Sequence, residues 1–192
     1  MSKISFEKQI TSTIQTLKKV FDELEISAYL IGAQARDVWF LPKTSPRITR
    51  DIDWVTEGVT FDDGITYQVA TLPSIVLLKL IAYADKPEYR AKDVEDIAYI
   101  FANFDIYTDD SFPLFTELEP EFISARTIGR KINYIVSNSH NLKSHVIQII
   151  ENQITKPEKS RFIQIMIGKS EQTERFIITQ LKELLKGLNE VL

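Results

Sequence analysis

One apolar stretch near the middle of the chain constrains the fold more than any other feature. Residues 72–84 read LPSIVLLKLIAYA, and Pro73 suits the first turn of a helix because proline lacks the backbone N–H that this position leaves unbonded. The rest of the stretch is almost entirely apolar, so a helix formed here must be covered on most of its sides. The remainder of the chain must therefore supply several elements that pack around it.

Helical periodicity dominates the sequence after this stretch. Val94, Ile97, Ala98 and Phe101 recur at helical spacing and predict a helix over residues 89–101. Weaker and stronger apolar stripes predict four further helices, at about 119–137, 141–152, 157–168 and 171–190.

The N-terminal part mixes helical and strand patterns. Apolar residues at spacings of three and four predict an amphipathic helix over residues 6–24, and AQARDVWFL, residues 33–41, also favours a helix. Three segments are typical of strands: AYLIG at 28–32, ITRDIDWV at 48–55 and GITYQV at 64–69. We therefore predict an α+β fold, with a small mixed β-sheet and flanking helices in residues 1–104 and a C-terminal helical bundle in residues 105–192.

Composition excludes several classes of site. The 192 residues carry a formal net charge of −4, which argues against a protein that coats nucleic acid over its whole surface. Cysteine is absent, so disulfides, thiolate metal sites and cysteine nucleophiles are excluded, and two histidines are too few for a histidine-built zinc site. No apolar run reaches the roughly 20 residues that span a bilayer, and the N-terminus lacks the apolar core of a signal peptide. We expect a soluble cytoplasmic protein with no membrane partner.

Asp51 and Asp53 form the strongest candidate for a chemical site. In a strand, residues i and i+2 point to the same face, so the two carboxylates would lie side by side. Such a pair repels itself unless a cation lies between the two groups, and carboxylate oxygens select Mg²⁺ or Mn²⁺. The alternative is an exposed strand face with two solvated acids, because a bare D-x-D pattern is common.

Groups suited to anions flank this pair in the sequence. Gly32 ends a buried-looking strand, and the predicted helix that follows carries Arg36, so a phosphate could approach the backbone at this turn. The loop before the acids is basic, with Lys43, Arg47 and Arg50. Anion-binding groups beside a metal pair are what phosphoryl chemistry requires, although a tight turn and a solvated loop would give the same pattern.

Three segments together resemble the nucleotidyltransferases of the DNA polymerase β superfamily, and within it the group around the AbiEii-type toxins and their bacterial relatives. The segments are YLIGAQARDVWF, RITRDIDW and LPSIVLLKLIAYADKPEYRAKDVEDIAYIF. The resemblance covers about residues 1–135, and the stretch ARTIGRKI at 125–132 resembles that group's helical tail. It implies a nucleotidyltransferase-like N-terminal domain.

The resemblance also implies roles for individual residues. Asp51 and Asp53 would be the catalytic metal ligands, with Mg²⁺ or Mn²⁺ as the cofactor and a nucleoside triphosphate as the substrate. Gly32 and Ala33 would form the phosphate-binding turn, although relatives have glycine or serine at the second position. The remaining residues that we expect to bind nucleotide or phosphate are Arg36, Arg47, Thr49 and Lys92.

The helical segment contributes further matched polar positions. Lys79, Lys92, Asp93 and Asp96 match them, and Lys92 could reach a nucleotide. The alternative for Lys92 and Asp96, which stand at i and i+4, is an ion pair on the helix surface.

The chain departs from the family after residue 58. Relatives have a long segment that brings a third carboxylate, whereas only 17 residues separate Asp53 from Thr71 here, with one convincing strand among them. Of the acids in that interval, Asp62 and Asp63 precede a glycine and read first as a turn. Either the natural protein carries an additional segment after Glu57, or it is a shortened form with weak or no catalysis.

Three functions follow from this sequence. The first is Mg²⁺-dependent transfer of a nucleoside monophosphate to a hydroxyl of an RNA end, a protein or a small molecule, as in a toxin–antitoxin component. The second is a non-catalytic protein that binds a nucleotide or a partner. The third is a helical module that docks a protein such as an antitoxin.

A group of basic residues in the C-terminal part has two interpretations. Arg126, Arg130 and Lys131 form either a phosphate-binding cluster or a solvated helix face.

Overall fold

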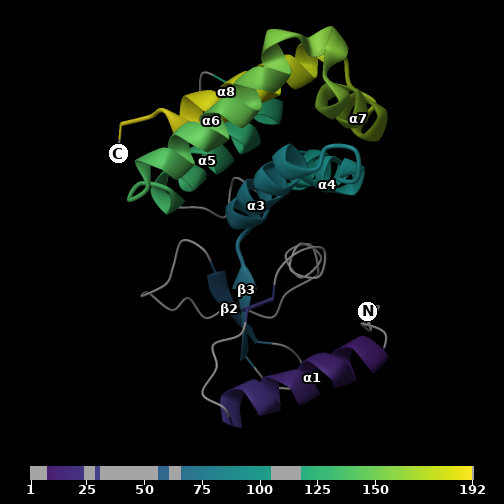
Figure 1. Ribbon diagram of the computed structural model, residues 1–192, viewed down its shortest axis with the longest axis vertical. Helices are drawn as coiled ribbons and strands as arrows, with labels where there is room; N and C mark the ends of the chain where they lie inside the picture. Colours follow the sequence, from purple (N-terminus) through teal and green to yellow (C-terminus); the bar gives the residue numbers. More distant parts are fainter. Residues whose placement is uncertain (1–7, 24–28, 31–55, 61–65, 105–117, 192) are drawn as a thin grey trace. The chain divides into compact units, whose positions relative to one another are not determined.

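The computed structural model describes most of the chain and divides it into two compact units, Met1–Ala70 and Thr71–Leu192, each of which is described here by itself (Figure 1). The boundary predicted between residues 104 and 105 is a different division and stays a prediction. The described residues are 8–23, 29–30, 56–60, 66–104 and 118–191.

In the first unit, the described residues form one helix and three short strands. Strand β3 lies between the other two, parallel to β1 and antiparallel to β2. Strands β2 and β3 pair from Thr56 opposite Ala70 to Thr60 opposite Thr66, which is their whole length. The elements are α1 (Lys8–Glu23), β1 (Tyr29–Leu30), β2 (Thr56–Thr60) and β3 (Thr66–Ala70).

Helix α1 and strand β3 confirm the helix predicted at 6–24 and the strand predicted at 64–69. Strand β2 was not predicted, because its central Gly58 weakens the strand pattern of the sequence TEGVT. The threonines and the valine around Gly58 are β-branched residues that favour a pleated strand, and pairing with β3 overrides the glycine.

The predicted α+β fold class is wrong for the described chain. Helices make up most of the described residues, whereas the three strands contain only 2, 5 and 5 residues. The prediction fails because the helical part of the chain is long: every described element after Ala70 is helical. The predicted helix at 33–41 and strand at 48–55 lie outside the described residues.

The second unit is entirely helical in its described residues. Its helices confirm the five predicted after residue 85, with shifted ends. Helix α7 begins after Ser160 and α8 after Thr173, because each of these side chains accepts a hydrogen bond from the backbone N–H three residues on. The helices are α3 (Leu72–Asp85), α4 (Ala91–Asn103), α5 (Pro120–Ile135), α6 (His140–Thr155), the single 3-10 turn η2 (Pro157–Lys159), α7 (Arg161–Ser170) and α8 (Glu174–Leu188).

Helix α3 is the buried element that the sequence requires. The side chain of Thr71 caps its start and Pro73 stands in its first turn. Helices α4, α5 and α6 pack around it, and Ile75, Val76 and Leu80 are all fully buried. The prediction that several elements must cover this stretch is confirmed.

The most extensive helix contact joins α5 and α8, which lie side by side in Figure 1. Helices α6 and α7 also pack on α8, and α7 packs on α4. None of the helices in the described ranges has the length and apolar character that crossing a bilayer requires.

Candidate functional site

A buried ion cluster joins α3 to α4. The Nζ atom of Lys79 lies 2.8 Å from Oδ1 of Asp93 and 2.7 Å from Oδ2 of Asp96. The lysine side chain is only 10% exposed and each aspartate 16%, so the three charges are largely shielded from solvent. Charges this deeply placed interact strongly, and each depends on its partners.

Local sequence explains why the three groups meet. Asp93 and Asp96 are three residues apart on α4 and therefore share a face of that helix. That face packs on α3, where Lys79 is the charged side chain among buried apolar ones. The D-x-x-D spacing on α4 thus directs two acids at one lysine of the neighbouring helix.

The cluster retains one unsatisfied acceptor. Oδ2 of Asp93 is buried and accepts no hydrogen bond, although Nη1 of Arg90 lies 3.6 Å away in an ion pair. Arg90 stands at the N-cap position of α4, where its side chain makes no capping hydrogen bond, and it is 48% exposed. A buried carboxylate oxygen without a hydrogen bond is costly, and the nearby charge of Arg90 offsets part of that cost.

Lys92 points elsewhere. It is exposed on α4 and makes no ion pair with another described residue. The predicted surface pair between Lys92 and Asp96 is not formed, because Asp96 pairs with Lys79 across the helix interface. The sequence predicts no ion-pair partner for Lys79, and the signal that could have identified its role is a lone charge on an otherwise apolar helix.

The other predicted site residues follow β1 and precede β2 in the sequence. They lie outside the described residues, and their roles stay predictions. Within the described ranges, no group of three or more acidic, histidine or cysteine side chains could hold a metal ion. The residues concerned are Gly32, Ala33, Arg36, Arg47, Thr49, Asp51 and Asp53.

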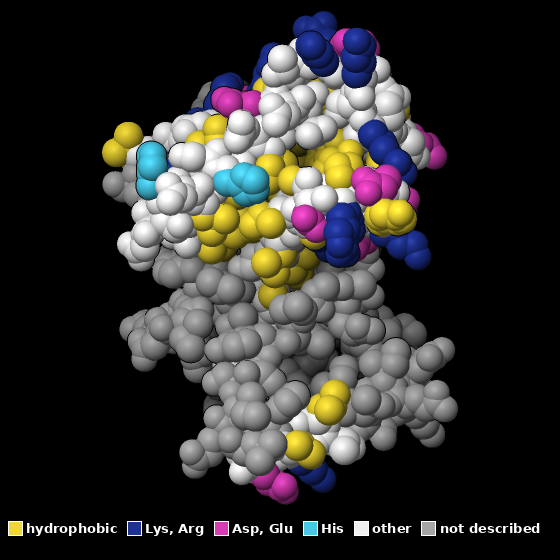
Figure 2. All heavy atoms as spheres, viewed as in Figure 1, with side chains coloured by type: hydrophobic (Ala, Val, Ile, Leu, Met, Phe, Trp, Pro, Cys, Tyr) yellow, Lys and Arg dark blue, Asp and Glu magenta, His cyan; other side chains and the backbone are white. Residues whose placement is uncertain are grey.

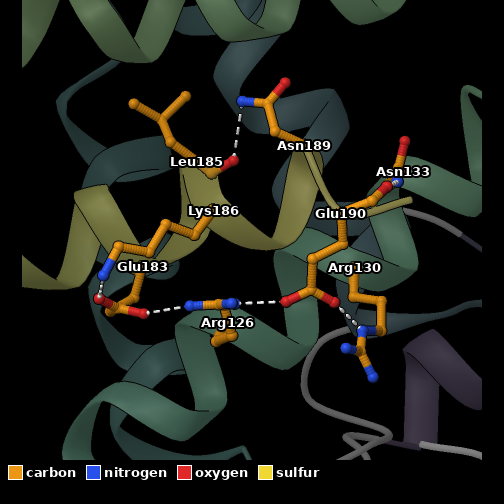
Figure 3. A network of polar contacts seen from close by, with 8 residues as sticks. All are labelled: Arg126, Arg130, Asn133, Glu183, Leu185, Lys186, Asn189 and Glu190. Atoms are coloured by element: carbon orange, nitrogen blue, oxygen red, sulfur yellow. Dashed lines mark hydrogen bonds and ion pairs between the residues drawn. The ribbon is translucent and has the colours of Figure 1, made fainter. Parts of the chain in front are cut away.

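A second ionic network ties α8 to α5 (Figure 3). Arg126 donates through Nη1 to Oε2 of Glu183, at 2.8 Å, and through Nε to Glu190. Glu190 also accepts from Nε of Arg130, so one carboxylate bridges two arginines that stand one turn apart. Figure 3 also shows Lys186 on Glu183, and Asn133 donating to the backbone carbonyl of Glu190 at 2.8 Å.

Burial and pairing set the charge states in this network. Burial raises the pKa of Glu183, but hydrogen bonds from Lys186 and Arg126 outweigh it and hold that pKa below its ordinary value. Burial lowers the pKa of Arg126, yet its bonds to Glu190 and Glu183 leave the pKa raised overall. Both groups therefore stay charged at neutral pH.

The network corrects one sequence-based interpretation. Arg126 and Arg130 are each only 18% exposed and bound to glutamates, so neither belongs to a solvated helix face. Their charges are already balanced within the protein, which makes them poor candidates for gripping a phosphate backbone. The glutamates that pair with them stand about 60 residues later, and no local sequence pattern connects the two sets.

Comparisons with family models, with curated proteins and with solved structures found no match to this chain.

Proposed function

We propose that this protein transfers a nucleoside monophosphate from a nucleoside triphosphate to a hydroxyl acceptor, with Mg²⁺ or Mn²⁺ as its cofactor. The observation that carries the proposal is the cluster of Lys79, Asp93 and Asp96. They are three of the four polar positions that the sequence resemblance singles out in this segment, and they meet in one buried group, whereas the fourth, Lys92, lies apart from it. Polar positions that come together in this way are typical of functional sites, although structural ion pairs also produce them.

Asp51 and Asp53 carry the metal part of the proposal. Two carboxylates one residue apart supply the hard oxygen donors that Mg²⁺ prefers, so the donor set fits the ion by its chemistry. When bound, the ion would supply positive charge to the phosphate oxygens and to the leaving pyrophosphate. The two aspartates would hold it, and Gly32 with Arg36 would orient the phosphates.

The α3–α4 cluster, taken by itself, favours an uncharged hydrogen-bond donor over a phosphate. It places two carboxylates around one ammonium group, with Arg90 at its edge. An additional anion would be repelled, whereas a hydroxyl could donate to Oδ2 of Asp93. Lys79 would then hold Asp93 in place.

A second candidate, a non-catalytic protein that binds a nucleotide or a partner, is favoured by the pairing of β2 with β3. Their ladder begins at Thr56, three residues after Asp53, and ends at Ala70, so the interval holds a hairpin-like pair in place of the longer segment of relatives. Glu57, opposite Val69, is the acid on a described strand in this interval. An antitoxin-like protein partner, and RNA, protein or small-molecule acceptors, stay predictions.

A transfer assay separates the two candidates. The protein is incubated with Mg²⁺ or Mn²⁺ and each of the labelled nucleoside triphosphates, with total RNA or no added acceptor, and label is followed on RNA and on the protein. The paired substitutions Asp51→Asn and Asp53→Asn should abolish transfer, since amides lose the charge that holds the cation. Lys182→Ala, at an exposed position of α8, is the matched control and should transfer normally.

The results of this assay distinguish the two candidate functions. Transfer that persists in the double variant contradicts the metal assignment. Nucleotide binding to the wild-type protein with no transfer under any condition supports the second candidate in place of the first.

A further inference from the structure

Glu190 is held at two points by one face of α5 (Figure 3). Its carboxylate accepts hydrogen bonds from Nε of Arg126 and Nε of Arg130, and its backbone carbonyl accepts one from the side-chain amide of Asn133 at 2.8 Å. The three donors stand at i, i+4 and i+7, a spacing that places them on one face of the helix. One residue is therefore recognised through both its side chain and its backbone.

The residue that binds these donors does not belong to a helix. Helix α8 ends at Leu188, and Glu190 follows two residues later. The next residue, Val191, is fully exposed. Glu190 thus contacts α5 in the way that a residue of a bound peptide would, and not through the packing of two helices.

The three donors are recessed in the protein. Lys and Arg side chains are prominent in Figure 2 along the edge of this unit where Figure 1 has α7 and the turn that leads into it. Arg126 and Arg130 differ from such surface cations, because each side chain is only 18% exposed, and Asn133 is 1% exposed. Polar groups at this depth need acceptors, so these donors select a group that supplies both a carboxylate and a carbonyl.

The charges of the two helices at this point favour an anion. Residues 126–133 of α5 carry three cations and no acid, whereas residues 182–190 carry two cations and the acids Glu183 and Glu190. Glu183 already pairs with Arg126 and Lys186. Without the carboxylate of Glu190, the two stretches would carry five cations and one acid, so a group that replaces it must also be negatively charged.

We propose that Arg126, Arg130 and Asn133 form a recognition site for a glutamate residue of an acidic peptide, and that Glu190 occupies this site within the chain. We call these three residues the glutamate site. The partner that fits it is a protein segment that presents a glutamate carboxylate together with the backbone carbonyl of the same residue. Because Glu190 is tethered beside the site, it competes with any outside peptide and lowers the apparent affinity of that peptide.

The backbone contact favours a peptide over a free anion. A phosphate group could accept hydrogen bonds from both arginines, but it is too compact to reach the amide of Asn133 as well. A glutamate spans that separation with the length of its side chain. The site does not depend on the proposed transfer reaction, because none of its residues is assigned to nucleotide or metal.

The test measures peptide binding by NMR, without nucleotide or metal. The peptide is the amidated sequence Asn-Glu-Val-Leu of residues 189–192, and the isotope-labelled full chain is followed through the side-chain N–H signals of Arg126, Arg130 and Asn133. Glu190→Ala removes the competing carboxylate and should bind the peptide at least about tenfold more tightly than the wild type. A peptide with glutamine in place of glutamate should bind this variant about tenfold more weakly, because the charge-assisted bonds are lost.

Further variants control for indirect effects. Glu174→Ala, which removes an exposed glutamate at the start of α8, should bind the peptide as the wild type does. Arg130→Gln combined with Glu190→Ala should remove the response to the peptide. If Glu190→Ala does not fold, Glu190→Gln, which keeps the side-chain volume, replaces it in the comparison.

Three results would overturn the proposal, whatever the transfer assay shows. They are equal affinity of the wild type and the Glu190 variant, equal affinity for the glutamate and glutamine peptides, and a response to inorganic phosphate but not to the peptide.

Discussion

Gly187 of α8 lies so close to Arg126 of α5 that a Cβ atom on the glycine would stand 2.2 Å from the arginine's carbonyl oxygen. The relationship is reciprocal, because a Cβ on Gly129 would stand 2.2 Å from the carbonyl oxygen of Leu184. The two helices therefore meet backbone to backbone. This close approach also brings Glu183 and Glu190 within reach of the arginines on α5.

Gly187→Ala should destabilise the second unit by about 3 kcal/mol or more, at the upper end of overpacking costs. The atoms that a methyl group would meet belong to the backbone of α5, which cannot rotate away as a side chain can. The free energy of unfolding in urea, followed by circular dichroism, measures the effect.

Gly168→Ala is the matched control for this change. Gly168 is also a helical glycine, on α7, but an added Cβ there meets no atom within 4 Å. Alanine should stabilise α7 by up to about 1 kcal/mol because it has the higher helix propensity. Equal effects of the two substitutions would contradict the close-contact interpretation.

How much of this structure the sequence could predict depends on the range over which the determining interactions act. The helices after residue 70 follow from local apolar periodicity, and Ser160 and Thr173 mark starts that a capping rule could have placed. Strand β2 could not be found in this way, since its pairing with β3 and not its own pattern stabilises it.

The candidate site was predicted only in part, for the same reason. The resemblance selected Lys79, Asp93 and Asp96, but only the packing of α3 on α4 shows which of them are partners. For Arg126 and Arg130 the sequence predicts either a phosphate-binding cluster or a solvated helix face, and neither is correct because their glutamate partners lie far along the chain. A count of charges along the sequence leaves out the ion-pair partners that folding brings in from distant positions.

Lys79→Met should cost about 3 kcal/mol of unfolding free energy, because it leaves two aspartates facing each other with little access to water. Methionine preserves most of the side-chain volume, so the loss reports the charge. Urea unfolding again provides the measurement. Lys92→Ala, an exposed lysine on α4, should change stability by less than about 0.5 kcal/mol.

A triple substitution tests whether Lys79, Asp93 and Asp96 act as a unit. If Asp93→Asn and Asp96→Asn are combined with Lys79→Met, the buried charges disappear together. The triple variant should then be more stable than Lys79→Met alone, since no uncompensated carboxylate remains. A triple variant less stable than Lys79→Met would contradict the ion-cluster explanation.

Glu183 should make the protein sensitive to acid. The folded state holds the pKa of this carboxyl below its ordinary value of 4.5, so the unfolded chain takes up the proton first as the pH falls. The stabilisation is therefore complete above the ordinary pKa and is lost as the pH falls through the lower folded pKa. Glu183→Gln should cost about 2 kcal/mol at neutral pH and progressively less below about pH 4.5.

The measurement is the free energy of unfolding of both proteins across this pH range. Glu151→Gln, at an exposed position of α6, should run parallel to the wild type at every pH. A constant difference between Glu183→Gln and the wild type down to strong acid would contradict the assignment of the proton to Glu183.

Glu171 ends α7 in a left-handed conformation, with φ of 58°, and its N–H bonds to the carbonyl of Ile167 at 2.9 Å. This backbone conformation is unfavourable by about 1–2 kcal/mol for a residue with a Cβ, whereas it is not for glycine. Glu171→Gly should therefore stabilise the protein by about 0.5–1 kcal/mol, after the greater freedom of glycine in the unfolded chain is deducted. Glu171→Ala separates the backbone from the charge, since it removes the same carboxylate from the helix C-terminus but keeps the Cβ. If the two variants melt at the same temperature, the gain comes from the charge and the backbone explanation is wrong.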